Sequence, residues 1–174
     1  MNQRVDTLKA AMWSLLAALA LSLHIFLAPP IAGPQLYGAL AVAGFGLLLP
    51  PISTLYMRFR GVNEHAAILT VMGGTALSIV GIGALTFDDL EPEAIFFLGM
   101  WWWVVGKFSA ESGLLDRRFG YVTMALALLA FAAVVGDLVG TRAAWTAARL
   151  ALAAWLIGLA VILYRSSANG SDAG

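Results

Sequence analysis

Acidic residues gather in one short stretch of the chain. Asp88, Asp89, Glu91 and Glu93 lie within six positions, and no lysine or arginine separates them. Hard divalent cations bind several carboxylate oxygens at once, so this stretch is a candidate cation site. The plainer interpretation is a solvated acidic loop that pairs with a nearby arginine. Our prediction therefore includes no metal ion and no other cofactor.

Arg149 is the arginine best placed for such a pair. It follows Arg142 and Trp145 at helical spacing, so the three share one helix face. A guanidinium keeps its charge at any accessible pH, and inside an apolar segment it must reach water or an anion. Asp137 and the acids at 88–93 are the candidates, and the Trp145 ring can face the cation. With His24 they form a predicted outer polar cluster that would bind a lipid head group or small solute: His24, Asp88, Asp89, Glu93, Asp137, Arg142, Trp145 and Arg149.

Three consecutive tryptophans, Trp101, Trp102 and Trp103, form a second candidate site. Neighbouring residues on a helix point about 100° apart, so at most two of these rings share a surface. They would form an aromatic wall for a flat or isoprenoid ligand. The alternative is bulky packing opposite small residues of neighbouring helices.

Pro50 and Pro51 predict a kink in an apolar segment. Each proline lacks an N–H and displaces the carbonyl four residues earlier, which frees the carbonyls of Gly46 and Leu47. Transporters use carbonyls of broken helices to bind ions. A simple kink is the alternative interpretation.

Motifs of known catalytic chemistry are missing from the sequence. It has no phosphate-binding G-x-x-x-x-G-K-[ST], no H-E-x-x-H and no G-x-S-x-G. Cysteine is absent, which excludes disulfides, iron–sulfur clusters and thiolate zinc sites. Ten cations balance ten anions, so no basic excess indicates nucleic acid as a partner. We therefore expect a protein without catalytic activity.

The elements that must position these residues are membrane helices. The chain of 174 residues is 61% hydrophobic and 11% charged, against about 25% charged in ordinary soluble domains. Its long apolar runs show no two-residue alternation, which favours helices over a barrel. The fold class predicted is all-α: one polytopic membrane domain over 1–174, a bundle of six transmembrane helices with a flexible tail at 165–174. The predicted helices are 10–28, 36–57, 66–87, 93–110, 119–137 and 144–164.

The basic residues predict the orientation, because cytoplasmic loops carry an excess of lysine and arginine. Eight cations fall at the two ends of the chain and near the second and fourth connections, which places both termini in the cytoplasm. The first apolar run of about 19 residues is expected to be a retained helix, since it exceeds the usual core of a signal peptide. Eight arginines against two lysines, with abundant alanine and glycine, favour a bacterial inner membrane.

Small residues at a spacing of four, such as Thr70, Gly74 and Ser78, allow helices to approach closely. They indicate packing inside the bundle or an interface between two copies of the chain. The function predicted is a non-catalytic binding or accessory subunit that contacts membrane lipids and a partner membrane subunit or a second copy. A small transporter or channel, using the kink and the outer cluster, is the alternative. An intramembrane enzyme comes third.

Overall fold

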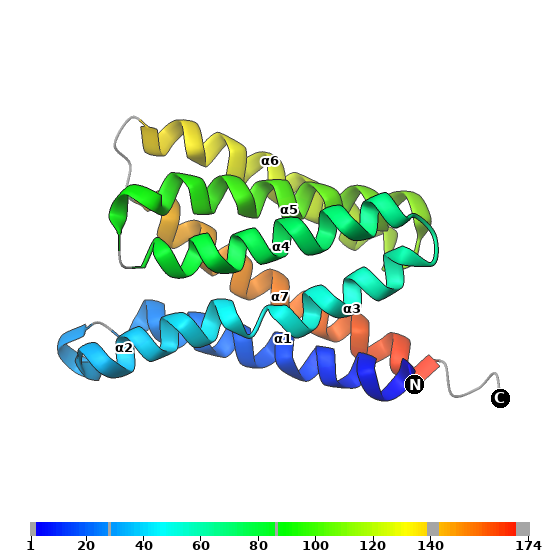
Figure 1. The fold of residues 1–174 in the computed structure, drawn as a ribbon, viewed down its shortest axis with the longest axis horizontal. Coiled ribbons are helices and arrows are strands. Elements are labelled where there is room, and N and C mark those ends of the chain that lie inside the picture. The colour runs from blue at the N-terminus through cyan, green and yellow to red at the C-terminus, as the bar shows by residue number, and fades with distance from the viewer. Residues whose placement is uncertain (1–2, 28, 86, 139–142, 170–174) are drawn as a thin grey trace.

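The computed structural model describes residues 3–27, 29–85, 87–138 and 143–169 (Figure 1). These residues are almost entirely helical and include no strand. Side chains at 3–4, 29–30, 32, 34, 88, 136–138 and 169 lie outside the description. In chain order the elements are α1 (Gln3–Phe26), α2 (Pro29–Gly46), α3 (Leu49–Arg60), α4 (Glu64–Gly83), the short 3₁₀ helix η1 (Asp88–Leu90), α5 (Glu91–Ser112), α6 (Arg117–Leu138) and α7 (Ala143–Asn169).

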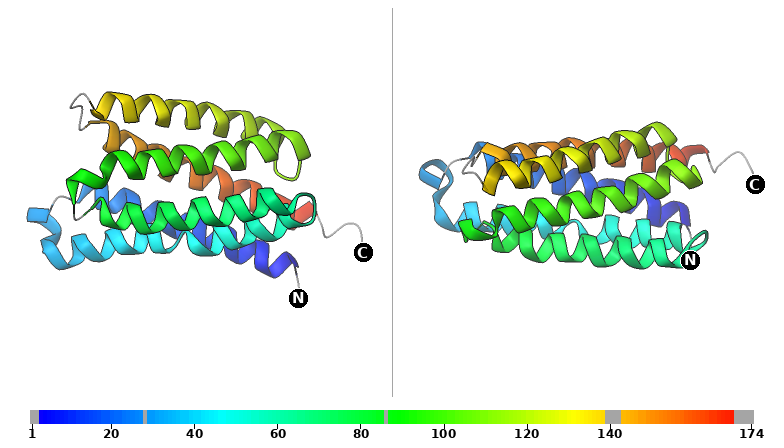
Figure 2. Two further views of the ribbon diagram at one scale, coloured as in Figure 1. Left: turned by 45° about the horizontal axis from the view of Figure 1, so that its top comes forward. Right: turned by 90° about the horizontal axis from the view of Figure 1, so that it is seen from above.

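The helices run back and forth as a bundle (Figures 1 and 2). In space, α6 packs on α5, α5 on α4, α4 on α3 and α3 on α1. Helix α7 packs along α1 and also contacts α6. The beginning of α1 and the end of α7 lie at the same end of the bundle, together with the α3–α4 and α5–α6 connections (Figure 1). We call this the terminal end and the opposite one the distal end.

Five segments are long and apolar enough to cross a membrane: Val5–Phe26, Gln35–Arg60, Glu64–Gly83, Arg117–Val135 and Ala143–Ala168. The predicted span at 93–110 is helix α5, which does not belong to this set. Glu91, Glu93 and Lys107 add charge to α5, and its buried face includes Trp101 and Trp102. A helix sheltered by its neighbours needs a less apolar surface than one surrounded by lipid. The count of six spans and the cytoplasmic termini stay predictions.

The predicted segment at 36–57 is divided into two helices. Helix α2 ends at Gly46, and α3 begins at Leu49 with Pro50 in its first turn. The Leu48 N–H bonds to the Phe45 carbonyl at 3.2 Å, which closes a tight turn between them. Pro50 and Pro51 have no N–H to continue the α-helical pattern from Gly46 and Leu47. The prolines therefore begin a new helix.

The stripe of small residues on α4 faces the interior of the chain. Thr70, Gly74 and Ser78 are buried, and a Cβ atom on Gly74 would lie 2.7 Å from Ile52 and 3.0 Å from Trp101 Nε1. The Thr70 hydroxyl donates to the Ala66 carbonyl at 2.8 Å, so it needs no partner from another helix. This stripe seats α3 and α5 against α4.

Helices α5 and α6 approach most closely where two glycines meet. A Cβ atom on Gly106 would lie 2.9 Å from the Gly120 carbonyl oxygen and 2.8 Å from the Met124 nitrogen. A Cβ atom on Gly120 would lie 2.5 Å from the Ala110 nitrogen. Only glycine fits at this crossing without moving the backbone.

Candidate functional sites at the two ends of the bundle

His24 and Arg149 meet at the distal end. His24 belongs to the last turn of α1 and is 1% exposed. Arg149 lies on α7, and its Nη1 is 3.1 Å from His24 Nδ1. A guanidinium can only donate, so Nδ1 is the acceptor and the ring hydrogen is assigned to Nε2. Among the described residues, neither His24 Nε2 nor Arg149 Nε has a hydrogen-bond partner.

Aromatic rings enclose this pair. The Tyr37 ring stacks on His24 with centroids 4.0 Å apart, and the Arg149 guanidinium lies 5.3 Å from the centre of the Trp145 ring. Arg149 Nη2 also donates to the Thr146 hydroxyl at 3.3 Å. Glu91, at the start of α5, lies within electrostatic range of Arg149. The charge is thus met by neutral acceptors, a ring face and one carboxylate.

Only part of the predicted outer cluster comes together in the described structure. His24, Trp145 and Arg149 do, whereas Asp89 and Glu93 are exposed and form no described ion pair with Arg149. Arg142 and the side chains of Asp88 and Asp137 lie outside the described residues. No group of three potential metal ligands occurs in the described part of the chain. Sequence reasoning missed Tyr37 as a partner, because no spacing rule connects a residue of α2 to His24 at the end of α1.

The three tryptophans pack inside the bundle. Trp101 and Trp102 are fully buried, and Trp103 is partly buried against the core. Trp155 of α7 lies between them and α6, with ring centroids 5.1 Å from Trp101 and 6.2 Å from Trp102. Trp101 lies over Gly73 and Gly74 of α4. This arrangement matches bulky packing against small residues, and it leaves no open aromatic wall at Trp101 and Trp102.

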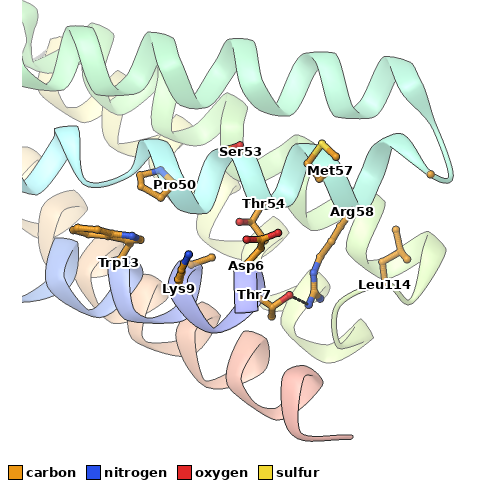
Figure 3. Close-up of a pocket in the computed structure, with 12 residues that line it drawn as sticks. Asp6, Thr7, Lys9, Trp13, Pro50, Ser53, Thr54, Met57, Arg58 and Leu114 are labelled. Carbon is orange, nitrogen blue, oxygen red and sulfur yellow. Dashed lines mark hydrogen bonds between the residues drawn. The ribbon is translucent and has the colours of Figure 1, made fainter. Parts of the chain in front are cut away.

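A groove at the terminal end was not predicted from the sequence. It lies between α1 and α3 and has a volume of about 840 Å³ (Figure 3). Ala10, Trp13, Pro50, Met57 and Leu114 give it apolar walls. Because Pro50 is among them, the groove extends to the break between α2 and α3.

Charged and polar groups lie at the mouth of this groove. They are Asp6 and Lys9 of α1 and Arg58 of α3. Arg58 Nη2 donates to the Thr7 hydroxyl at 3.3 Å and to the Ser166 hydroxyl at 2.8 Å, so it connects α3 with α1 and α7. Among the described residues, no carboxylate forms an ion pair with Lys9 or Arg58. The topology rule alone accounts for a cation at position 58, so no pattern along the chain indicates a ligand here.

Comparison with protein-family models, with curated proteins and with solved structures finds no match to this chain.

Proposed function

We propose that the chain is an integral membrane protein of six passes, with both termini in the cytoplasm of a bacterial cell. It acts as a non-catalytic binding or accessory protein, and the groove between α1 and α3 holds an anionic phospholipid. Five apolar segments support the membrane placement, and the start of α1 and the end of α7 lie at the same end of the bundle, as an even number of passes requires. Under this orientation the groove opens at the cytoplasmic surface.

The observation that carries the lipid proposal is Arg58 at the mouth of an apolar groove. Hydroxyls of Thr7 and Ser166 orient the guanidinium, but they do not neutralise it. A lipid phosphate would supply the missing anion and bind through charge-assisted hydrogen bonds. The acyl chain would then lie along Trp13, Pro50 and Met57. Basic pockets between membrane helices on the cytoplasmic side suit phospholipid head groups in this way.

A transporter is the second candidate, and the helix break beside the groove favours it. Broken helices near the middle of a membrane often bind the transported ion or substrate. However, Leu21, Phe45 and Leu48 are all fully buried. Phe45 also stacks on Trp145 beside the distal pair, with centroids 6.1 Å apart. This apolar packing between the groove and the distal end favours a protein that holds its ligand.

Retention of phosphatidylglycerol by the purified protein tests the proposal. We would reconstitute the chain in phosphatidylcholine nanodiscs with and without phosphatidylglycerol, release it, and count bound lipids by native mass spectrometry. The wild type should retain phosphatidylglycerol, and Arg58→Gln should lose about fivefold in affinity, as expected for one cation near a lipid phosphate. Equal binding by wild type and Arg58→Gln would contradict the proposal.

Arg60→Gln is the matched control. Arg60 lies two residues further along α3, is exposed and faces the Tyr56 ring at 6.0 Å, outside the groove lining. The Arg60→Gln variant removes the same charge from the same helix end. Because Arg60 does not line the groove, this variant should leave lipid retention unchanged. Thermal unfolding of each variant would show whether a loss of lipid reflects a loss of fold.

A further inference from the structure

Helix α1 has a second groove on its other side. This groove lies between α1 and α7 and has a volume of about 600 Å³. Its walls are apolar and include Met12, Leu15 and Val161. Lys9, Tyr164 and Arg165 lie at its terminal end, and no acidic residue lines it. It therefore has the same plan as the groove between α1 and α3: an apolar channel with cations at the mouth.

Lys9 lines both grooves. It is exposed on the part of α1 that separates them, with Arg58 on one side and Arg165 on the other. The Arg58 side chain also reaches α7, where it bonds to Ser166, the residue after Arg165. The two grooves thus share Lys9 of α1, and Arg58 of the first groove also contacts the turn of α7 that contains Arg165.

The charged residues that line the two grooves suit a ligand with two negative charges. Lys9, Arg58 and Arg165 supply three cations, and Asp6 is the one acid among the residues that line either groove. None of these cations forms an ion pair with a carboxylate in the described part of the chain. A phospholipid with a single phosphate would leave one of the two grooves without an acyl chain and the cation of that groove without an anion.

We propose that the two grooves together bind one phospholipid of the cardiolipin class, which carries two phosphates on a shared glycerol and four acyl chains. One phosphate lies between Lys9 and Arg58, the other between Lys9 and Arg165, and the shared glycerol crosses α1. One pair of chains occupies each groove. This inference rests on the proposed function, because it takes the α1–α3 groove to be a lipid site.

Competition between cardiolipin and phosphatidylglycerol at equal total charge tests whether one lipid occupies both grooves, an arrangement that we call the clamp. The wild type in mixed nanodiscs should retain one cardiolipin in preference to phosphatidylglycerol, counted by native mass spectrometry. Arg165→Gln should weaken cardiolipin binding about fivefold and leave phosphatidylglycerol in the α1–α3 groove unaffected. Arg118→Gln, an exposed cation at the same end that lines neither groove, is the control and should change nothing.

The outcomes separate the two proposals. If Arg165→Gln keeps the full preference for cardiolipin, or if the wild type shows no preference, the clamp is wrong and the single-groove function stands. If neither lipid binds in a manner that depends on Arg58, both proposals fail. Two phosphatidylglycerol molecules that bind as tightly as one cardiolipin would also refute the clamp, since they would show two independent sites.

Discussion

Arg149 donates to His24 across 3.1 Å and so ties α7 to α1 at the distal end of the bundle. The acceptor is a neutral imidazole nitrogen, and the Tyr37 ring stacks on the same imidazole. A partly buried charge of this kind is stable only where dipoles, ring faces or an acid surround it. Removal of either partner should therefore lower the free energy of unfolding by more than the hydrogen bond itself contributes.

Replacement of Arg149 by Met should destabilise the bundle. His24 Nδ1 would lose its donor while the ring stays buried, which costs about 1–3 kcal/mol for an unsatisfied polar group. Reversible unfolding in detergent micelles measures the change in the free energy of unfolding. An Arg149→Met variant as stable as the wild type would show that the contact is not needed.

The double variant His24→Leu, Arg149→Met should recover much of that loss. It removes both polar groups, so no buried donor or acceptor stays unpaired. The single His24→Leu variant should also have a lower free energy of unfolding than the wild type, because it removes a hydrogen-bond acceptor of the partly buried Arg149 guanidinium. Losses that simply add in the double variant would argue that the two side chains act independently.

Replacement of Thr123 by Val should leave a buried indole N–H without a hydrogen-bond acceptor. Trp155 Nε1 donates to the Thr123 hydroxyl at 2.9 Å, and Thr123 is fully buried. Valine has nearly the same shape but accepts no hydrogen bond, so we expect a loss of about 1–3 kcal/mol in the free energy of unfolding. Thr123→Ser keeps the hydroxyl and is the control. A Thr123→Val variant as stable as the wild type would show that the hydrogen bond to Trp155 is not needed, whereas a loss seen in Thr123→Ser alone would measure the packing of the threonine methyl group.

Helical runs and the place of the helix break follow from local rules that the sequence displays. Apolar length predicts the helices, and Pro50 and Pro51 mark the break between α2 and α3. The His24–Arg149 contact is different, because it joins residues 125 positions apart. Helical spacing assigns Arg149 to a face of α7, but only the packing of α7 on α1 shows that the face meets His24.

The groove could not be predicted for the same reason. Its mouth combines Asp6 and Lys9 from the first helix with Arg58 from the third. Each of these residues has a sufficient explanation within its own segment, as a solvated group or a topology signal. Their common function depends on the gap that α1 and α3 leave between them, and no pattern along the chain encodes that gap.

Replacement of Gly120 by Ala should separate α5 from α6. The new methyl would lie 2.5 Å from the Ala110 nitrogen, so the backbones must move apart, at a cost of about 1–3 kcal/mol. Gly38→Ala is the control: no atom lies within 4 Å of its Cβ position on α2. Alanine there should stabilise the helix by about 0.5–1 kcal/mol. Thermal unfolding that ranks Gly120→Ala at or above the wild type would contradict the close crossing.

Single cysteines should report the topology of six passes, since the natural chain has no cysteine to interfere. Val62 and Asp116 are exposed at the terminal end, and Ile31 and Phe87 are exposed at the distal end. These positions avoid Gly33 and Gly113, whose positive φ angles would strain a cysteine.

A thiol reagent that cannot cross membranes should label Ile31→Cys and Phe87→Cys in intact cells, and should reach Val62→Cys and Asp116→Cys only after lysis. Labelling of all four in intact cells, or the reverse pattern, would overturn the cytoplasmic termini. If Val62→Cys and Asp116→Cys differ from each other, α4 and α5 do not cross as a pair, and the count of six passes is wrong.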